Sequence, residues 1–175
     1  MAPSLLAGFG FAFVLIVIRV RGIDIVPDSV GLAAYALAMW RLASSRVFVA
    51  AATVAALAAA IGLLNFVPSL LPDPIAISAM LAYNTCVALA IILGAWGLRA
   101  RARAAGEKIA AQLTSIVALA ALGLAAFLIG WLTYPISHQA AGVIIGSGRL
   151  VNIVVMVWYV ILLVVTSPRD WAKPA

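Results

Sequence analysis

Asp28 and Asp73 are the residues whose type and setting are best suited to chemistry. Each follows a proline, in Val26-Pro27-Asp28 and in Leu71-Pro72-Asp73, and each precedes a long apolar run. Two carboxylates held close together in a medium of low dielectric cannot both ionise readily, so one of them keeps its proton. A retained proton beside an apolar cavity is a general acid. The pair therefore predicts acid chemistry on an apolar substrate.

Helix capping is the competing interpretation of the same two residues. An aspartate at the start of a helix accepts hydrogen bonds from the free backbone N–H groups of the first turn. The helix dipole also favours the charged carboxylate, which works against a role as proton donor. The distance between the two carboxylates decides between these roles, because only close carboxylates share a proton.

Other polar and aromatic residues recur at helical spacing within the apolar runs, as Asp28 and Tyr35 do, or Met80 and Asn84. Polar groups are costly there, and stripes that converge would line one cavity in the outer half of a bundle, with His138 as a further polar group. Packing and hydrogen bonding between helices are the alternative roles. The predicted substrate-binding residues are Tyr35, Asn65, Met80, Asn84, Phe127, Trp131, Tyr134, Asn152, Met156 and Tyr159.

The composition requires a lipid environment for these stripes. The chain is 67% hydrophobic and 9% charged, with a mean hydropathy of +1.23, whereas soluble domains carry about 25% charged residues. The apolar runs are about 17–26 residues long, which is typical of transmembrane helices, whereas barrel strands are alternating segments of about 10 residues. We expect one all-α integral membrane domain over residues 1–175, a compact bundle of six transmembrane helices. The expected spans are 4–18, 28–43, 47–67, 73–98, 109–134 and 149–166.

The connections carry two further expectations. An outer connection is predicted from Pro135 through Gly142, Gly146 and Gly148 to the sixth span at Arg149. The first two helical hairpins both turn at a Pro-Asp sequence, which suggests a parallel repeat with a site at its interface.

Charge sets the expected orientation. Six spans bring both termini to one side, where eight basic residues would gather, against Arg19, Arg21 and Arg149 on the other side. Cytoplasmic segments carry the excess of lysine and arginine. We therefore expect a multi-pass protein of the bacterial plasma membrane with both termini in the cytoplasm. The net charge of +6 is interpreted as this topology signal and not as nucleic-acid binding.

Cysteine and histidine counts limit the remaining chemistry. One cysteine, Cys86, and one histidine, His138, exclude a disulfide within the chain and a cluster of such ligands for a metal. No cofactor and no metal are predicted. The expected partners are the lipid bilayer and an apolar small-molecule substrate, and a homo-oligomer is left open.

The segment Gly22-Ile23-Asp24-Ile25-Val26-Pro27-Asp28-Ser29-Val30-Gly31, continuing to Trp40-Arg41-Leu42, resembles a group of small, largely uncharacterised bacterial integral membrane proteins. These carry an I-D-x-x-P-D-x-x-G element after their first span. The resemblance covers the first third of the chain. The chain is also similar to the small membrane-bound bacterial terpene cyclases of indole-terpenoid pathways, compact helical bundles whose acids start the reaction by protonation. In its six-span size it looks like the substrate-binding subunits of energy-coupling-factor transporters.

Three hypotheses of function follow. The first is a proton-initiated cyclase or isomerase of an isoprenoid-like molecule, with Asp28 and Asp73 as catalytic acids and aromatic faces that stabilise a carbocation. The second is a small-solute-binding or transport component. The third is an accessory membrane subunit.

Overall fold

The computed structural model describes residues 2–15, 19–20, 23–24, 28–43, 45–64 and 72–169, which form six helices and one pair of short strands. The side chains of residues 19, 20, 23, 24, 64, 73 and 74 lie outside this description. The helices are α1 (Pro3–Leu15), α2 (Asp28–Arg41), α3 (Arg46–Leu64), α4 (Asp73–Ala104), α5 (Ile109–Thr133) and α6 (His138–Thr166). The strands β1 (Arg19–Val20) and β2 (Ile23–Asp24) pair antiparallel.

Four of these helices, α3 to α6, are long and apolar enough to cross a membrane. The prediction of a helical membrane protein is confirmed at this level. The six predicted spans are not all matched, because α1 has 13 residues and α2 has 14. At 1.5 Å per residue each is about 20 Å long, which is less than the roughly 30 Å of a hydrocarbon core.

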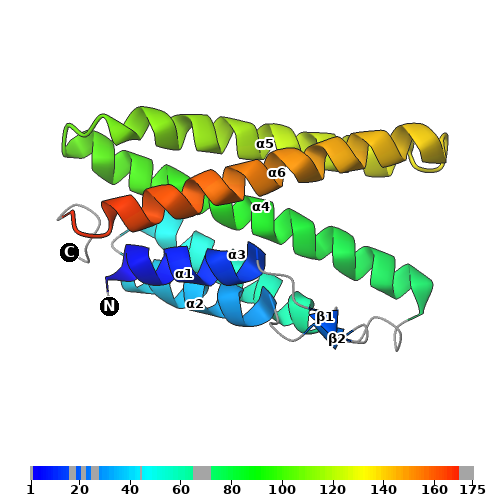
Figure 1. The fold of residues 1–175 in the computed structure, drawn as a ribbon, viewed down its shortest axis with the longest axis horizontal. Coiled ribbons are helices and arrows are strands. Elements are labelled where there is room, and N and C mark those ends of the chain that lie inside the picture. Colours follow the sequence, from blue (N-terminus) through cyan, green and yellow to red (C-terminus); the bar gives the residue numbers. More distant parts are fainter. Residues whose placement is uncertain are drawn as a thin grey trace.

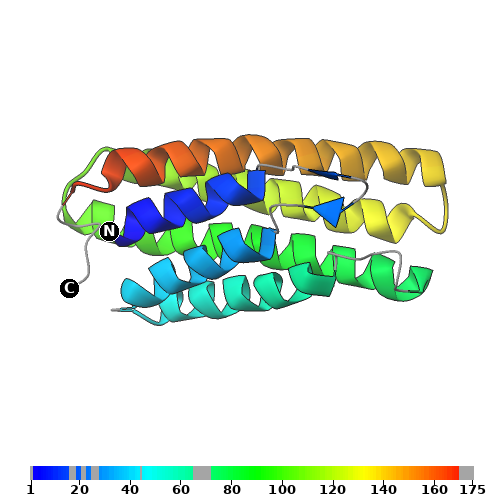
Figure 2. The same cartoon turned by 60° about the horizontal axis from the view of Figure 1, so that its bottom comes forward.

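Each helix packs against its neighbours in the chain, and α1 closes the ring by packing against α6. The beginning of α1 and the end of α6 lie at the same end of the bundle (Figure 1). Figures 1 and 2 show that α1 and α2 occupy only the half of the bundle next to that end, whereas α4, α5 and α6 run its full length. The far half is therefore built mainly from α4, α5 and α6.

Aromatic side chains fill the middle of the ring. Phe11, Tyr35 and Tyr159 are fully buried, and their rings meet edge to face. The Tyr35 hydroxyl donates a hydrogen bond to the Ala90 carbonyl oxygen at 3.0 Å and lies 3.1 Å from the Tyr159 hydroxyl. Gly94 leaves room for both hydroxyl groups, since a Cβ atom there would lie 2.7 Å from the Tyr159 oxygen and would overlap Tyr35.

The beginning of α6 differs from the prediction. The expected outer connection through Gly142, Gly146 and Gly148 is wrong, because these residues belong to α6 itself. The Ser137 side chain caps this helix by accepting a hydrogen bond from the Ala140 backbone N–H. A Cβ atom on Gly148 would lie 2.8 Å from the Gly123 carbonyl oxygen. The glycine thus serves close packing of α5 on α6, as small residues do between membrane helices.

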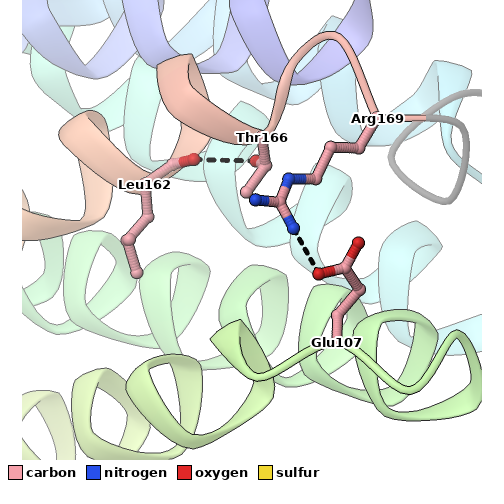
Figure 3. A network of polar contacts seen from close by, with 4 residues as sticks. All are labelled: Glu107, Leu162, Thr166 and Arg169. Atoms are coloured by element: carbon pink, nitrogen blue, oxygen red, sulfur yellow. Dashed lines mark hydrogen bonds and ion pairs between the residues drawn. The ribbon is translucent and has the colours of Figure 1, made fainter.

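The charged connection after the fourth span is also shorter than predicted. Helix α4 continues past Leu98 through three arginines to Ala104, and only residues 105–108 turn into α5. Gly106 takes the left-handed conformation that this turn needs, with φ of 71°. The carboxylate of Glu107 then forms an ion pair with Arg169 just after α6 (Figure 3). In the same view Thr166 donates to the Leu162 carbonyl oxygen.

Candidate functional site

A cavity of about 160 Å³ lies between α4 and α6. Its wall is mainly apolar, with two carboxamides and one guanidinium as the polar groups. Three residues predicted from the helical stripes, Asn84, Asn152 and Met156, are brought together here from two helices. The lining residues are Asn84, Val87, Ala88, Ile91, Arg149, Asn152, Ile153 and Met156.

Arg149 is the unusual member of this wall. It lies within the apolar run of α6, and not at its boundary as predicted, eleven positions after the first residue of the helix. Its Nη2 donates to the Met80 sulfur at 3.2 Å, and its guanidinium lies 6.0 Å from the centre of the Phe127 ring. In the part of the chain that the structure describes, no carboxylate pairs with it. A charge in an apolar span is costly unless it meets a partner or a polar cavity.

The two carboxamides present different groups to this space. The Asn84 Nδ2 group donates to the Met80 carbonyl oxygen at 2.7 Å, which leaves its Oδ1 atom as an acceptor. The Asn152 Oδ1 atom is turned toward α5, since a Cβ atom on Gly123 would lie 3.0 Å from Asn152 Cγ and closer still to Oδ1. That oxygen is buried and has no hydrogen-bond partner among the described residues. The same carboxamide carries the Nδ2 donor group, and Asn152 lines the cavity.

The two candidate acids do not line the cavity as described. Asp28 is the first residue of α2, and its Oδ2 atom accepts a hydrogen bond from the Tyr83 hydroxyl of α4 at 2.9 Å. Asp73 is the first residue of α4, and its side chain lies outside the described residues. The distance between the two carboxylates, and with it the shared proton, stays a prediction. The position of Asp28 at the head of a helix is the one that both capping and the helix dipole favour.

The other predicted substrate-binding residues lie in the core or on the α5 side, apart from Asn65. Tyr35 and Tyr159 are core residues paired through their hydroxyls and do not line the cavity. On the α5 side, Phe127 and Trp131 lie with Tyr134 and His138 in a chain of ring contacts. The Trp131 Nε1 group is buried and has no partner among the described residues. Asn65 lies outside the described residues.

Two residues of this region were missed as site residues. Arg149 begins the predicted sixth span and shares its stripe with Asn152, Met156 and Tyr159. It was counted as an end-of-span charge and not as a site residue, although a lone arginine within apolar sequence is a signal of an intramembrane charge. Tyr83 directly precedes Asn84 and falls on a different helical face, so the stripe pattern does not include it. Its position opposite Asp28 depends on how α2 and α4 pack, which spacing alone does not contain.

The described residues contain no group of three or more histidine, cysteine, aspartate or glutamate side chains that could hold a metal ion. Comparisons with protein-family models, with curated proteins and with solved structures find no match to this chain. The chemistry must therefore be argued from the site itself. A guanidinium within a candidate membrane span, beside a carboxamide donor and a carboxamide acceptor, is suited to binding an anion.

Proposed function

We propose that this chain binds an amphiphilic molecule in the membrane and holds its anionic head group in the cavity between α4 and α6. The observation that carries this proposal is Arg149, a guanidinium within an apolar helix whose described contacts are a thioether and the face of a ring. Neither contact neutralises its charge. An anion with an apolar body would do so while staying in the bilayer.

The donors at the cavity favour a phosphate or a carboxylate. A guanidinium offers planar, often bidentate hydrogen bonds to either group. Asn152 adds a carboxamide donor, and Asn84 Oδ1 can accept from a hydroxyl of the same head group. Met80 is a weak acceptor, so an anionic oxygen would displace it from Arg149 at little cost.

The size of the cavity supports a head group rather than a whole molecule. Pockets that enclose drug-sized ligands measure about 300–1,000 Å³, and this cavity holds about 160 Å³. An apolar remainder would have to leave the cavity. This supports the binding class over an enzyme that encloses a folded isoprenoid chain.

The same proposal includes the finer topology. We place the chain in a bacterial plasma membrane with both termini in the cytoplasm and six passes in total. Helices α3 to α6 form four of these passes, and the first two are helical over only part of the hydrocarbon core, in α1 and α2. Because Arg149 lies within α6, the outer side has two of its three predicted basic residues, Arg19 and Arg21. The excess of basic residues on the cytoplasmic side is therefore larger than predicted. Lys108 and the arginines at the end of α4 lie at the opposite, cytoplasmic end.

The test compares Arg149→Gln with Arg149→Lys and with a matched control, Arg103→Gln, an exposed arginine near the end of α4. The full chain is placed in nanodiscs, and binding of phosphatidic acid and of phosphatidylcholine is measured by native mass spectrometry. Loss of a hydrogen bond to a charged group costs about 1.5–3 kcal/mol, so Arg149→Gln should weaken phosphatidic acid binding about tenfold or more. Arg149→Lys should retain part of it, and Arg103→Gln all of it. Equal binding by Arg149→Gln and the control would exclude the proposal.

Acid chemistry on an isoprenoid is a second proposal, favoured by one observation, the hydrogen bond from Tyr83 to Asp28. Tyr83 fixes the carboxyl group between α2 and α4, as a positioned general acid needs. Asp28→Asn keeps the shape and much of the capping ability but removes the acid. Asp28→Asn and Asp73→Asn are assayed in membranes with prenylated aromatic substrates. Turnover that both variants retain in full would rule out general-acid catalysis.

A further inference from the structure

We infer that an apolar groove on α6 holds the hydrocarbon chain of the molecule whose head group Arg149 binds, and that this molecule enters sideways from the bilayer. The groove measures about 370 Å³ and is lined by Ile153, Val154, Val157, Trp158 and Ile161. The inference rests on the proposed function and extends it, since it assigns the place and the chemical class of the apolar part. The ligand is then a membrane lipid with an acidic head group.

The groove continues the cavity along the same helix. Ile153 lines both spaces, so the head-group site and the groove adjoin at this residue. From Arg149 to Ile161 the helix advances about 18 Å, at 1.5 Å per residue. A chain that leaves the cavity at Ile153 can follow α6 over this length toward the C-terminal end of the helix (Figure 1).

The groove lies on a face of α6 that α1 does not cover. Helix α1 contacts α6 around Val160, Leu163 and Val164, next to Gly8. It ends at Leu15 and occupies only half of the bundle (Figure 2). Four of the five groove residues, Ile153, Val154, Val157 and Ile161, are exposed, and Trp158 is half-buried.

The head-group cavity and the apolar groove contribute differently to binding. A hydrocarbon chain gains little by leaving lipid for an equally apolar protein surface. The groove can therefore determine where the hydrocarbon chain lies, but it adds little to the affinity for the lipid. The selectivity for acidic over neutral lipids must come from the charged head group. The consequence is specific: filling the groove should move the chain, and removing the Arg149 charge should abolish the preference for the acidic lipid.

Photo-crosslinking separates these two effects. The full chain is placed in nanodiscs with phosphatidic acid or phosphatidylcholine that carries a diazirine in one acyl chain, and crosslinked peptides are mapped by mass spectrometry. The variants are Arg149→Gln, Val157→Phe, which fills the groove, and Val143→Phe. Val143 is an exposed valine of α6 outside the groove, so it is the matched control. Native mass spectrometry confirms that each variant is folded and reports total lipid binding.

For the unaltered chain we expect phosphatidic acid to crosslink to residues 153–161 about tenfold more than phosphatidylcholine. Val157→Phe should remove most of this crosslinking while phosphatidic acid still binds, and Val143→Phe should leave it unchanged. If Arg149→Gln weakens binding but the crosslinks lie elsewhere, or respond equally to both phenylalanine variants, the groove inference is wrong and the head-group proposal stands. If Arg149→Gln changes neither binding nor crosslinking, both are wrong.

Discussion

The hydroxyl groups of Tyr35 and Tyr159 meet in the middle of the bundle, where no water is needed to satisfy them. Tyr35 donates its proton to the Ala90 carbonyl oxygen, so Tyr159 must be the donor in the bond between the two hydroxyls. The two tyrosines are therefore not equivalent. Tyr35 is both donor and acceptor, whereas Tyr159 is only a donor.

This asymmetry predicts unequal effects of removing each hydroxyl. Tyr35→Phe leaves the buried Tyr159 donor without an acceptor, which costs about 1–3 kcal/mol. Tyr159→Phe leaves Tyr35 bonded to Ala90 and should cost about 0.5–1.5 kcal/mol, the usual net value of one hydrogen bond. Thermal unfolding in detergent, followed by circular dichroism, measures the difference. A larger loss for Tyr159→Phe would contradict the assigned direction of the bond.

For single residues, the sequence predicted which side chains face inward better than it predicted what those side chains contact. Helical spacing placed Tyr35, Tyr159, Asn84, Asn152 and Met156 on inward faces, and all five are buried or half-buried. Spacing could not predict that the two tyrosines would pair with each other instead of facing the cavity, because that depends on the approach of α2 and α6. The orientation of each carboxamide depends in the same way on its neighbours, Met80 for Asn84 and Gly123 for Asn152.

Helix α6 shows why element boundaries are harder to predict in lipid than in water. Gly142, Gly146 and Gly148 resemble a loop by the standards of a soluble protein, in which glycine destabilises a helix by about 1 kcal/mol relative to alanine. In a membrane no water is present to satisfy an unfolded backbone, so the helix continues through them. Because the sixth span was predicted to begin at Arg149, this residue was interpreted as a charge at the end of a span and was not included among the predicted site residues.

The glycines of α6 differ in what surrounds them, and this predicts a contrast between two similar substitutions. A Cβ atom on Gly148 would lie 2.8 Å from the Gly123 oxygen and 2.9 Å from the Phe127 nitrogen, both backbone atoms of α5. Gly148→Ala must therefore push α5 and α6 apart, which overpacked sites show to cost about 1–3 kcal/mol. Thermal unfolding in detergent gives this loss directly.

Gly146→Ala is the matched control on the same helix. Nothing lies within 4 Å of a Cβ atom at Gly146, so the substitution should be neutral or should stabilise the helix by up to about 1 kcal/mol. Equal losses for both variants would mean that α5 and α6 do not pack through Gly148. Gly148→Ala should also disturb the site at Arg149, because Phe127 lies against both Gly148 and Arg149.

Over the whole molecule, the two ends of the bundle differ in charge. The end at which α4 passes into α5 carries Arg99, Arg101, Arg103 and Lys108, together with the ion pair between Glu107 and Arg169 (Figure 3). Both partners of this pair are partly exposed, so it contributes at most about 1 kcal/mol. The opposite turn, from Thr133 to His138, has no charged residue. This polarity of the bundle, rather than any single pair, sets the expected orientation.

The orientation is testable with two turns that the structure places at opposite ends of the bundle. Ala105 lies in the turn after α4, and Ile136 lies between α5 and α6, where 86% of its side chain is exposed. The only native thiol is Cys86, so Cys86→Ser provides a background without cysteine into which Ala105→Cys and Ile136→Cys are introduced separately. A membrane-impermeant maleimide should label Ile136→Cys in intact cells and Ala105→Cys only after the membrane is permeabilised. The reverse pattern would place the arginine-rich end outside and would put the head group at Arg149 nearer the inner leaflet, since Arg149 lies in the half of α6 that begins at His138.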